Sequence, residues 1–105
     1  MITNLYNDIV DTSVICNASV YAAESMYEAG ISDPSLTLLF GIKYLDGHYF
    51  VFIDDNTGCF CGVSEYSGDY ATFDVTDFLD DIENSKPEAY ESFDIALDGY
   101  YKSKQ

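Results

Sequence analysis

The sequence predicts an α+β domain in which a small three-stranded antiparallel sheet packs against N-terminal and C-terminal helices. Helical periodicity of apolar residues marks both ends of the chain, and strand-like apolar runs separated by turn dipeptides fill the middle. No stretch rich in Gly, Ser or Pro divides the 105 residues. We therefore expect a single domain that spans residues 1–105.

Residues 3–29 carry the first helical pattern. Gly30 stands where a left-handed C-terminal cap is expected. The β-branched and polar residues of 11–19 weaken the middle of this pattern, so two shorter helices are an alternative to one. The apolar residues recur at steps of three, four or seven: Leu5, Ile9, Cys16, Val20, Ala23 and Tyr27.

A meander of three strands is predicted at residues 36–45, 48–53 and 59–66. Asp46-Gly47 is a strong hairpin signal and is predicted to form the first turn. Residues 54–58 form the second turn, and Ser67-Gly68-Asp69 is predicted to end the sheet. The strands are rich in large apolar residues, as half-buried or fully buried strands are.

Two helices follow the meander. The first begins after Thr72 and places Phe78, Leu79 and Ile82 on one face. Ser85-Lys86-Pro87-Glu88 then fits a capping box with proline in the first turn of the last helix. The apolar face of that helix consists of Tyr90, Phe93, Leu97 and either Tyr100 or Tyr101.

The charge of the chain excludes several classes of partner. Asp and Glu total 19 against 4 Lys and no Arg, which gives a formal net charge of −15. Such a chain lacks the cations that contact nucleic acid or anionic membranes. With 48% hydrophobic residues it is not a disordered acidic tail either. Solubility of a small domain needs a charge of only about 2–8 in magnitude, so it does not explain this excess.

The acids are also unevenly distributed. Residues 54–98 contain 13 of them together with a single lysine, Lys86.

The cysteines number 3 and show no framework spacing, as is typical of reduced thiols in the cytosol. The N-terminus lacks a basic region followed by an apolar run, so we expect no signal peptide and a cytoplasmic protein.

Catalytic and metal-binding motifs are sparse. His48 is the single histidine, and no nucleophile elbow or P-loop accompanies it, so we expect no enzymatic activity. Cys59 and Cys61 with His48 fall short of the four ligands of a structural zinc site. Asp54 and Glu65 match the ends of a calcium loop, but the positions between them do not. We assign no catalytic residue, metal ligand or cofactor, and a small metal-binding domain remains an alternative.

The acids of residues 77–84 recur every three or four positions. On a helix this spacing places carboxylates about 5 Å apart along one face. A DNA strand presents a phosphate about every 3.4 Å, so the two arrays are of similar scale. Tyrosines interleaved with nearby acids add aromatic anchors of the kind enriched at interfaces. The predicted partner-binding residues are Asp54, Asp55, Glu65, Tyr66, Asp69, Tyr70, Asp74, Asp77, Asp80, Asp81 and Glu83.

In its size, acidity and Asp- and Tyr-rich composition the chain resembles the small DNA-mimicking inhibitors that phages and mobile elements encode, the anti-CRISPR and anti-restriction proteins. The resemblance implies an acidic inhibitor in the host cytosol that occupies the DNA-binding groove of a basic nucleic-acid-processing protein, such as a CRISPR effector or a restriction enzyme. An immunity protein that neutralises a basic nuclease toxin shares these features and remains an alternative. Neither reading involves direct binding to nucleic acid or to a membrane.

Overall fold

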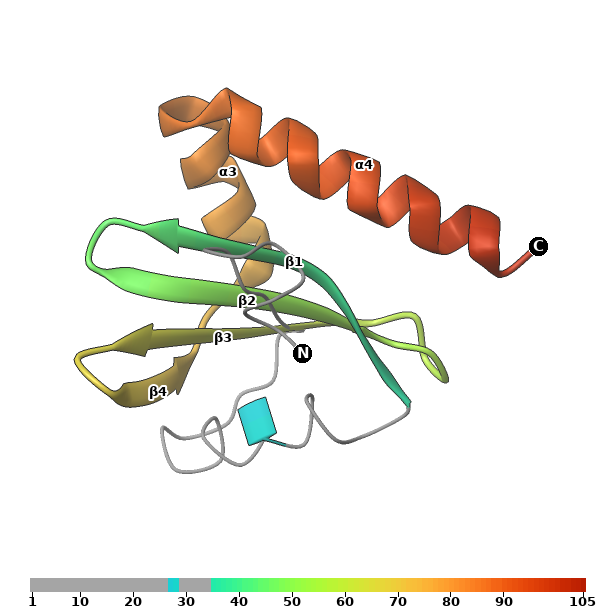
Figure 1. The fold of residues 1–105 in the computed structure, drawn as a ribbon, viewed down its shortest axis with the longest axis horizontal. Helices are drawn as coiled ribbons and strands as arrows, with labels where there is room; N and C mark the ends of the chain where they lie inside the picture. Colours follow the sequence, from blue (N-terminus) through green and yellow to red (C-terminus); the bar gives the residue numbers. More distant parts are fainter. Residues whose placement is uncertain (1–26, 29–34) are drawn as a thin grey trace.

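A four-stranded antiparallel meander forms the centre of the molecule, in the order β1-β2-β3-β4. The computed structural model describes Tyr27, Glu28 and residues 35–105. Both helices of the C-terminal part lie on the same side of the sheet (Figure 1). The α+β class is thus confirmed, but the sheet has one strand more than predicted. The elements are β1 (Leu36–Tyr44), β2 (Gly47–Asp54), β3 (Phe60–Tyr66), β4 (Asp69–Thr72), α3 (Val75–Ser85) and α4 (Pro87–Ser103).

The fourth strand exists because Ser67-Gly68 makes a tight turn. Both residues have positive φ, 51° and 88°, which is the pattern of a type I′ hairpin turn. The turn pairs Tyr66 with Asp69 and returns the chain along β3. The prediction that Ser67-Gly68-Asp69 ends the sheet is therefore wrong, since this dipeptide extends the sheet instead.

The β1–β2 turn is displaced by one residue from its predicted position. Leu45 and Asp46 occupy it, whereas Gly47 pairs with Tyr44 as the first residue of β2. A Cβ atom on Gly47 would lie 2.5 Å from the Glu65 carbonyl oxygen, so this position accepts only glycine. Leu45 has φ +54°, a left-handed conformation that destabilises a non-glycine residue by about 1–2 kcal/mol.

Strand β2 is buried on both faces of the sheet, which explains its uninterrupted apolar run. Val51 and Ile53 face the helices, and Phe50 and Phe52 face the other side, which we call the second face. On the second face Tyr27 stacks on Tyr70 with ring centroids 4.4 Å apart. The second face therefore has an apolar cluster of its own, which contains Phe50, Phe52, Cys61 and Val63 with Tyr27, Leu36, Leu38 and Tyr70 packed against it.

The helices close the first face through aromatic contacts. Phe78 of α3 stacks on Tyr49 at 4.4 Å, and Phe93 of α4 meets Phe40 edge-on at 5.7 Å. Helix α4 begins with Pro87 as predicted, but Lys86 is its N-cap residue and makes no side-chain cap hydrogen bond. The capping box is thus wrong, because Ser85 is the last residue of α3.

The helical pattern predicted over residues 3–29 lies outside the described residues, except for Tyr27 and Glu28. These two residues are helical. Tyr27 also contacts Phe50, with ring centroids 4.8 Å apart.

The contact between Gly62 and Phe73 gives a first prediction. A Cβ atom at residue 62 would lie 2.6–2.9 Å from the Phe73 ring, whose residue also donates its backbone N–H to the Gly62 carbonyl. We expect Gly62→Ala to lower the free energy of unfolding by about 1–3 kcal/mol, because the ring cannot keep its position.

Gly99 provides the matched control, since a Cβ atom there meets nothing within 4 Å in α4. Gly99→Ala is expected to stabilise the fold by up to about 1 kcal/mol through helix propensity. Urea unfolding of both variants checks the pair. Equal stability of Gly62→Ala and wild type would contradict the packing described above.

Candidate functional site

The antiparallel topology distributes the predicted partner-binding residues over two ends of the sheet. The β1–β2 and β3–β4 turns lie at one end, and the β2–β3 turn lies at the other beside the C-terminal end of α4 (Figure 1). Tyr66 and Asp69 therefore belong to the first end, whereas Asp54 and Asp55 belong to the second. The predicted set does not form one continuous surface.

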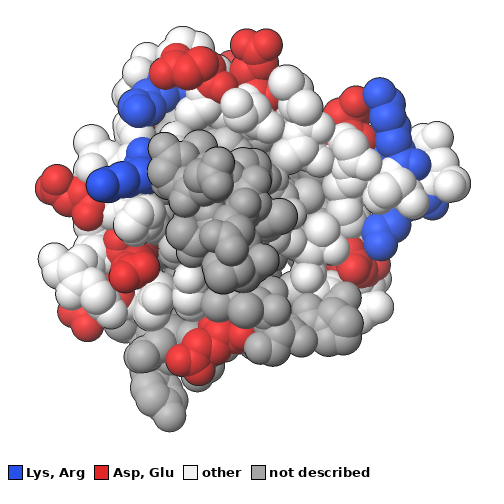
Figure 2. All heavy atoms as spheres, viewed as in Figure 1, with Lys and Arg blue, Asp and Glu red and all other residues white. Residues whose placement is uncertain are grey.

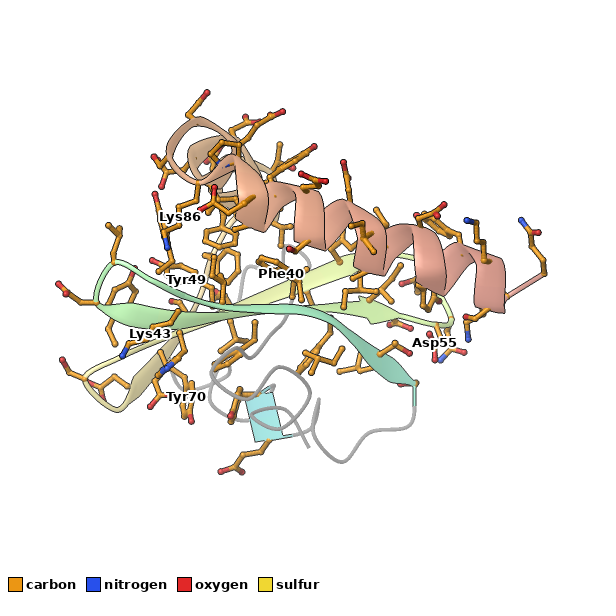
Figure 3. The ribbon with its side chains drawn as sticks, turned by 45° about the horizontal axis from the view of Figure 1, so that its top comes forward. Phe40, Lys43, Tyr49, Asp55, Tyr70 and Lys86 are labelled. Carbon is orange, nitrogen blue, oxygen red and sulfur yellow. The ribbon has the colours of Figure 1, made fainter. Side chains whose placement is uncertain are left out.

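Asp55 is engaged within the fold at the second end. Its carboxylate accepts hydrogen bonds from Thr37 Oγ1 at 3.0 Å and from the Tyr100 hydroxyl at 2.8 Å. Lys104 Nζ lies 3.5 Å from the same carboxylate. Figure 3 shows Asp55 beneath the C-terminal part of α4. These contacts fasten the end of the last helix to the β2–β3 turn and leave less of the carboxylate for a partner.

The same contacts shift two pKa values. Partial burial pushes the pKa of Asp55 upward, but the hydrogen bonds from Tyr100 and Thr37 and the charge of Lys104 together outweigh it, so this pKa lies below 3.8. Burial, and then the hydrogen bond to Asp55, raise the pKa of Tyr100 to about 12. Both shifts favour the protonation states that the two groups have at neutral pH, a charged Asp55 carboxylate and a neutral Tyr100 phenol.

Three more predicted residues have local structural roles. Asp54 accepts the backbone N–H of Asn56 at 2.8 Å within the turn. Asp74 is the N-cap of α3 and accepts the N–H groups of Thr76 and Asp77 at 2.9 and 3.2 Å. Tyr70 packs into the second-face cluster against Tyr27. Their residue types are therefore explained by the fold before any partner is considered.

The first end of the sheet brings tyrosines and carboxylates together. Tyr44, Gly47, Tyr66 and Asp69 lie side by side across the four strands in one register row. The Tyr44 hydroxyl donates to Asp81 of α3 at 2.8 Å, which places that helix beside the row. Asp77 precedes Asp81 by one helical turn on the same side. We call this region the hairpin-end surface and define it as Leu45, Asp46, Tyr66, Asp69, Asp77 and Asp81.

The potential at the hairpin-end surface is negative around Tyr66. Burial of the ring raises the pKa of the Tyr66 hydroxyl, and the charges of Asp46 and Asp81 raise it further. The residue is nonetheless 37% exposed, with one side of its ring over Gly47 and an edge contact to Tyr49 at 5.6 Å. Tyr66 is thus a partly exposed aromatic residue that packs on Gly47 and Tyr49 and lies near the carboxylates of Asp46 and Asp81.

A second acidic group lies where α3 meets α4. The charge of Asp94, then burial, then the charges of Glu83 and Asp80 raise the pKa of the Tyr90 hydroxyl, so these carboxylates lie in its neighbourhood. Asp80 and Glu83 therefore face α4, whereas Asp81 faces the hairpin. The acids of residues 77–84 cover a wide exposed arc of α3 and not the single narrow face expected from their spacing.

Lysines do not neutralise these acids within the described part of the chain. Lys102 pairs with Asp98 at 2.8 Å and Lys104 with Asp55, both near the C-terminal end of α4. Lys43 and Lys86 lie nearer the first end (Figure 3), and neither forms an ion pair with a described residue. Figure 2 shows carboxylates along the margin over the α3–α4 junction and the hairpin turns, with lysine side chains between them that form no ion pair with a described residue. The acids of the hairpin-end surface thus keep their charge available.

The candidate metal ligands do not converge. Among residues 27, 28 and 35–105 no group of three or more His, Cys, Asp or Glu side chains is placed to hold a metal ion. Glu65 pairs with His48 near the start of β2, and Asp54 ends that strand about 20 Å away. Cys61 pairs with Phe52, about 13 Å along β2 from His48. The calcium-loop and zinc alternatives therefore gain no support from the described geometry.

Comparisons of the chain with protein-family models, with curated proteins and with solved structures give no match. None of the helices described by the structure is long and apolar enough to cross a membrane.

The sequence-based prediction missed part of the hairpin-end surface. Leu45 and Asp46 were assigned to a strand end and a turn, because Asp46-Gly47 is the stronger hairpin signal. A one-residue shift of that turn would have exposed Leu45. The position of Asp81 beside Tyr44 has no signal in the sequence, since it depends on how α3 packs on β1.

The Asp55 network gives a second prediction, on pH. A carboxyl group whose folded pKa lies below its unfolded value of 3.8 stabilises the fold above that value and loses the effect as pH falls through the folded pKa. We expect Asp55→Asn to lower the free energy of unfolding by about 1–3 kcal/mol at pH 7. The difference from wild type should shrink as pH falls below 3.8.

Asp98→Asn is the control. It removes a carboxylate from the exposed ion pair with Lys102 in α4, and we expect it to leave the free energy of unfolding unchanged. Thermal melts at pH 7 and at pH 3 measure all three proteins. A difference between Asp55→Asn and wild type that is the same at both pH values would contradict a role for the charged carboxylate.

Proposed function

We propose that this protein is an acidic inhibitor that binds the basic nucleic-acid-binding surface of a nuclease complex in the cytoplasm and thereby blocks DNA binding. It acts by binding and not by catalysis. The observation that carries the proposal is the hairpin-end surface, where Asp46 and Asp81 lie near the exposed Tyr66 and Asp77 precedes Asp81 by one helical turn. None of these three acids has a lysine partner among the described residues.

The geometry of α3 supports a DNA-like array. Asp77 and Asp81 are separated by about 6 Å of helix rise, and Asp80 and Glu83 lie on the adjacent side of the same exposed arc. Phosphates along DNA are spaced on the same scale, at about 3.4 Å per strand. Lysines and arginines arranged for a phosphate backbone can thus pair with these carboxylates. The net charge of −15 also accelerates encounter with a basic partner.

The partner class is a CRISPR effector, a restriction enzyme or a nuclease toxin. A toxin partner would make the protein an immunity protein, and the same acidic surface would serve it. Binding assays with one purified member of each class separate these alternatives. The panel contains a DNA-cleaving CRISPR effector loaded with its guide RNA, a restriction enzyme that is able to bind DNA, and a basic nuclease toxin.

Charge reversal tests the exposed acids of α3, at Asp77 of the hairpin-end surface and at Asp80 on the adjacent side of the helix. We expect Asp77→Lys combined with Asp80→Lys to weaken binding at least about 10-fold, because two carboxylates of the exposed arc would repel the basic partner. Asp81 is left unchanged, since its hydrogen bond with Tyr44 contributes to the fold. Isothermal titration or biolayer interferometry measures the affinity, and circular dichroism verifies folding.

Glu91→Lys combined with Asp98→Lys is the matched control. It changes the net charge by the same amount on exposed positions of α4. Long-range steering falls equally in both variants, so only contact at α3 distinguishes them. Equal weakening in the two variants would show that net charge, and not this surface, governs binding.

Salt provides an independent test of the electrostatic contribution. The affinity of wild type is expected to fall steeply between about 50 and 500 mM NaCl, because exposed charges more than a Debye length apart become screened. Affinities measured at four salt concentrations define the slope. An affinity that does not change with salt would argue against recognition of a basic surface.

A further inference from the structure

The hairpin-end surface contains an apolar side chain that packs into neither cluster of the described residues. Leu45 is 71% exposed at the tip of the β1–β2 hairpin. The preceding residue, Tyr44, donates a hydrogen bond to Asp81. The following residue, Asp46, lies near the Tyr66 hydroxyl. Leu45 belongs to neither apolar cluster of the sheet. Burial within the fold therefore does not explain why a large aliphatic residue occupies this turn.

The backbone conformation at residue 45 is unfavourable for leucine. Its φ of +54° is a conformation that favours glycine, asparagine or aspartate. Asp46 is not among the residues with positive φ, and hairpin turns with positive φ only at the first turn residue take glycine there. In the other two-residue turn, by contrast, Ser67-Gly68 places a glycine at one of its two positive-φ positions. Leucine at residue 45 thus lowers stability, and neither apolar cluster of the described residues compensates for it.

The charges around Leu45 decide what can cover it. Asp46 and Asp81 lie close enough to Tyr66 to raise the pKa of its hydroxyl, and Asp69 pairs with Tyr66 across the sheet. A second copy of this chain would bring the same carboxylates together in a molecule with a net charge of −15. A partner whose apolar patch is surrounded by Lys and Arg would instead be complementary in charge.

We infer that Leu45, with the exposed edge of Tyr66, is an apolar anchor that inserts into a shallow apolar pocket within the basic surface of the partner protein. This inference rests on the proposed function and extends it, since it assigns to the turn a contribution to affinity that does not depend on charge. The carboxylates steer and orient the complex, and the anchor slows its dissociation.

The test compares Leu45→Gly with Leu45→Met, using the member of the three-protein panel that binds wild type. Leu45→Gly suits the backbone conformation, so we expect its melting temperature to rise by about 4–8 °C. Its affinity should fall about 10- to 30-fold, because the apolar contact is lost. Leu45→Met keeps an apolar side chain and the strained backbone, so both quantities should remain near wild type.

Salt separates the anchor from the charges. The ratio of wild-type to Leu45→Gly affinities is expected to stay constant as NaCl is raised, because burial of apolar surface is not screened. The effect of Asp77→Lys with Asp80→Lys should diminish over the same range. A Leu45→Gly protein that binds within twofold of wild type would overturn the anchor and leave the proposed function standing.

Three other outcomes also decide. Equal weakening by Leu45→Met and Leu45→Gly would overturn the anchor, because an apolar side chain would then not suffice. A wild-type protein that is dimeric by light scattering, and monomeric as Leu45→Gly, would assign the residue to self-association instead. A wild-type protein that binds no member of the panel would overturn the inference together with the proposed function.

Discussion

Burial of strand β2 on both faces is the constraint on which the rest of the structure depends. Phe50, Val51, Phe52 and Ile53 are at most 1% exposed, so every residue of this run is part of an apolar cluster. Such a strand needs a layer on each side. On one side α3 and α4 provide it, and on the other the aromatic contacts of Tyr27 contribute. The apolar residues of the described chain are largely committed to these two clusters, which leaves the periphery to carboxylates.

A domain with a net charge of −15 is destabilised by repulsion among its own acids. Several of these acids are used in ways that reduce the penalty. Asp74 caps a helix N-terminus, where negative charge is favourable. Asp55 accepts two hydroxyl donors and lies near a lysine. Asp81 accepts the Tyr44 hydroxyl. The excess charge is therefore partly used within the fold, and only the remaining acids are left for the partner that we propose.

Sequence patterns located most of the described elements because local signals and burial agree for them. The strands β1 to β3 begin and end near apolar runs and turn dipeptides, and Pro87 marks the start of α4. Strand β4 escaped prediction because Asp69-Tyr70-Ala71-Thr72 is short and lacks an apolar run. Its existence depends on a turn geometry that Ser67-Gly68 permits.

The candidate site was harder to predict because it depends on which end of the sheet each turn reaches. Alternating hairpin turns lie at opposite ends of an antiparallel meander, so Asp55 could have been separated from Asp69 by counting strands. The hydrogen bond from Tyr100 to Asp55 could not be predicted from the sequence, since the packing of α4 on the sheet brings these two residues together. Charge density along the sequence therefore overestimates the surface that a partner can contact.

The distribution of roles among the acids bears on how such a surface achieves specificity. Carboxylates alone attract any basic protein, so charge by itself does not select one partner among nucleic-acid-binding proteins of similar charge. The anchor that we propose at Leu45 would discriminate among them, because partners without an apolar pocket would have to cover this exposed side chain with polar groups. The strained backbone at Leu45 is consistent with this division, since a turn under selection for stability alone would carry glycine there.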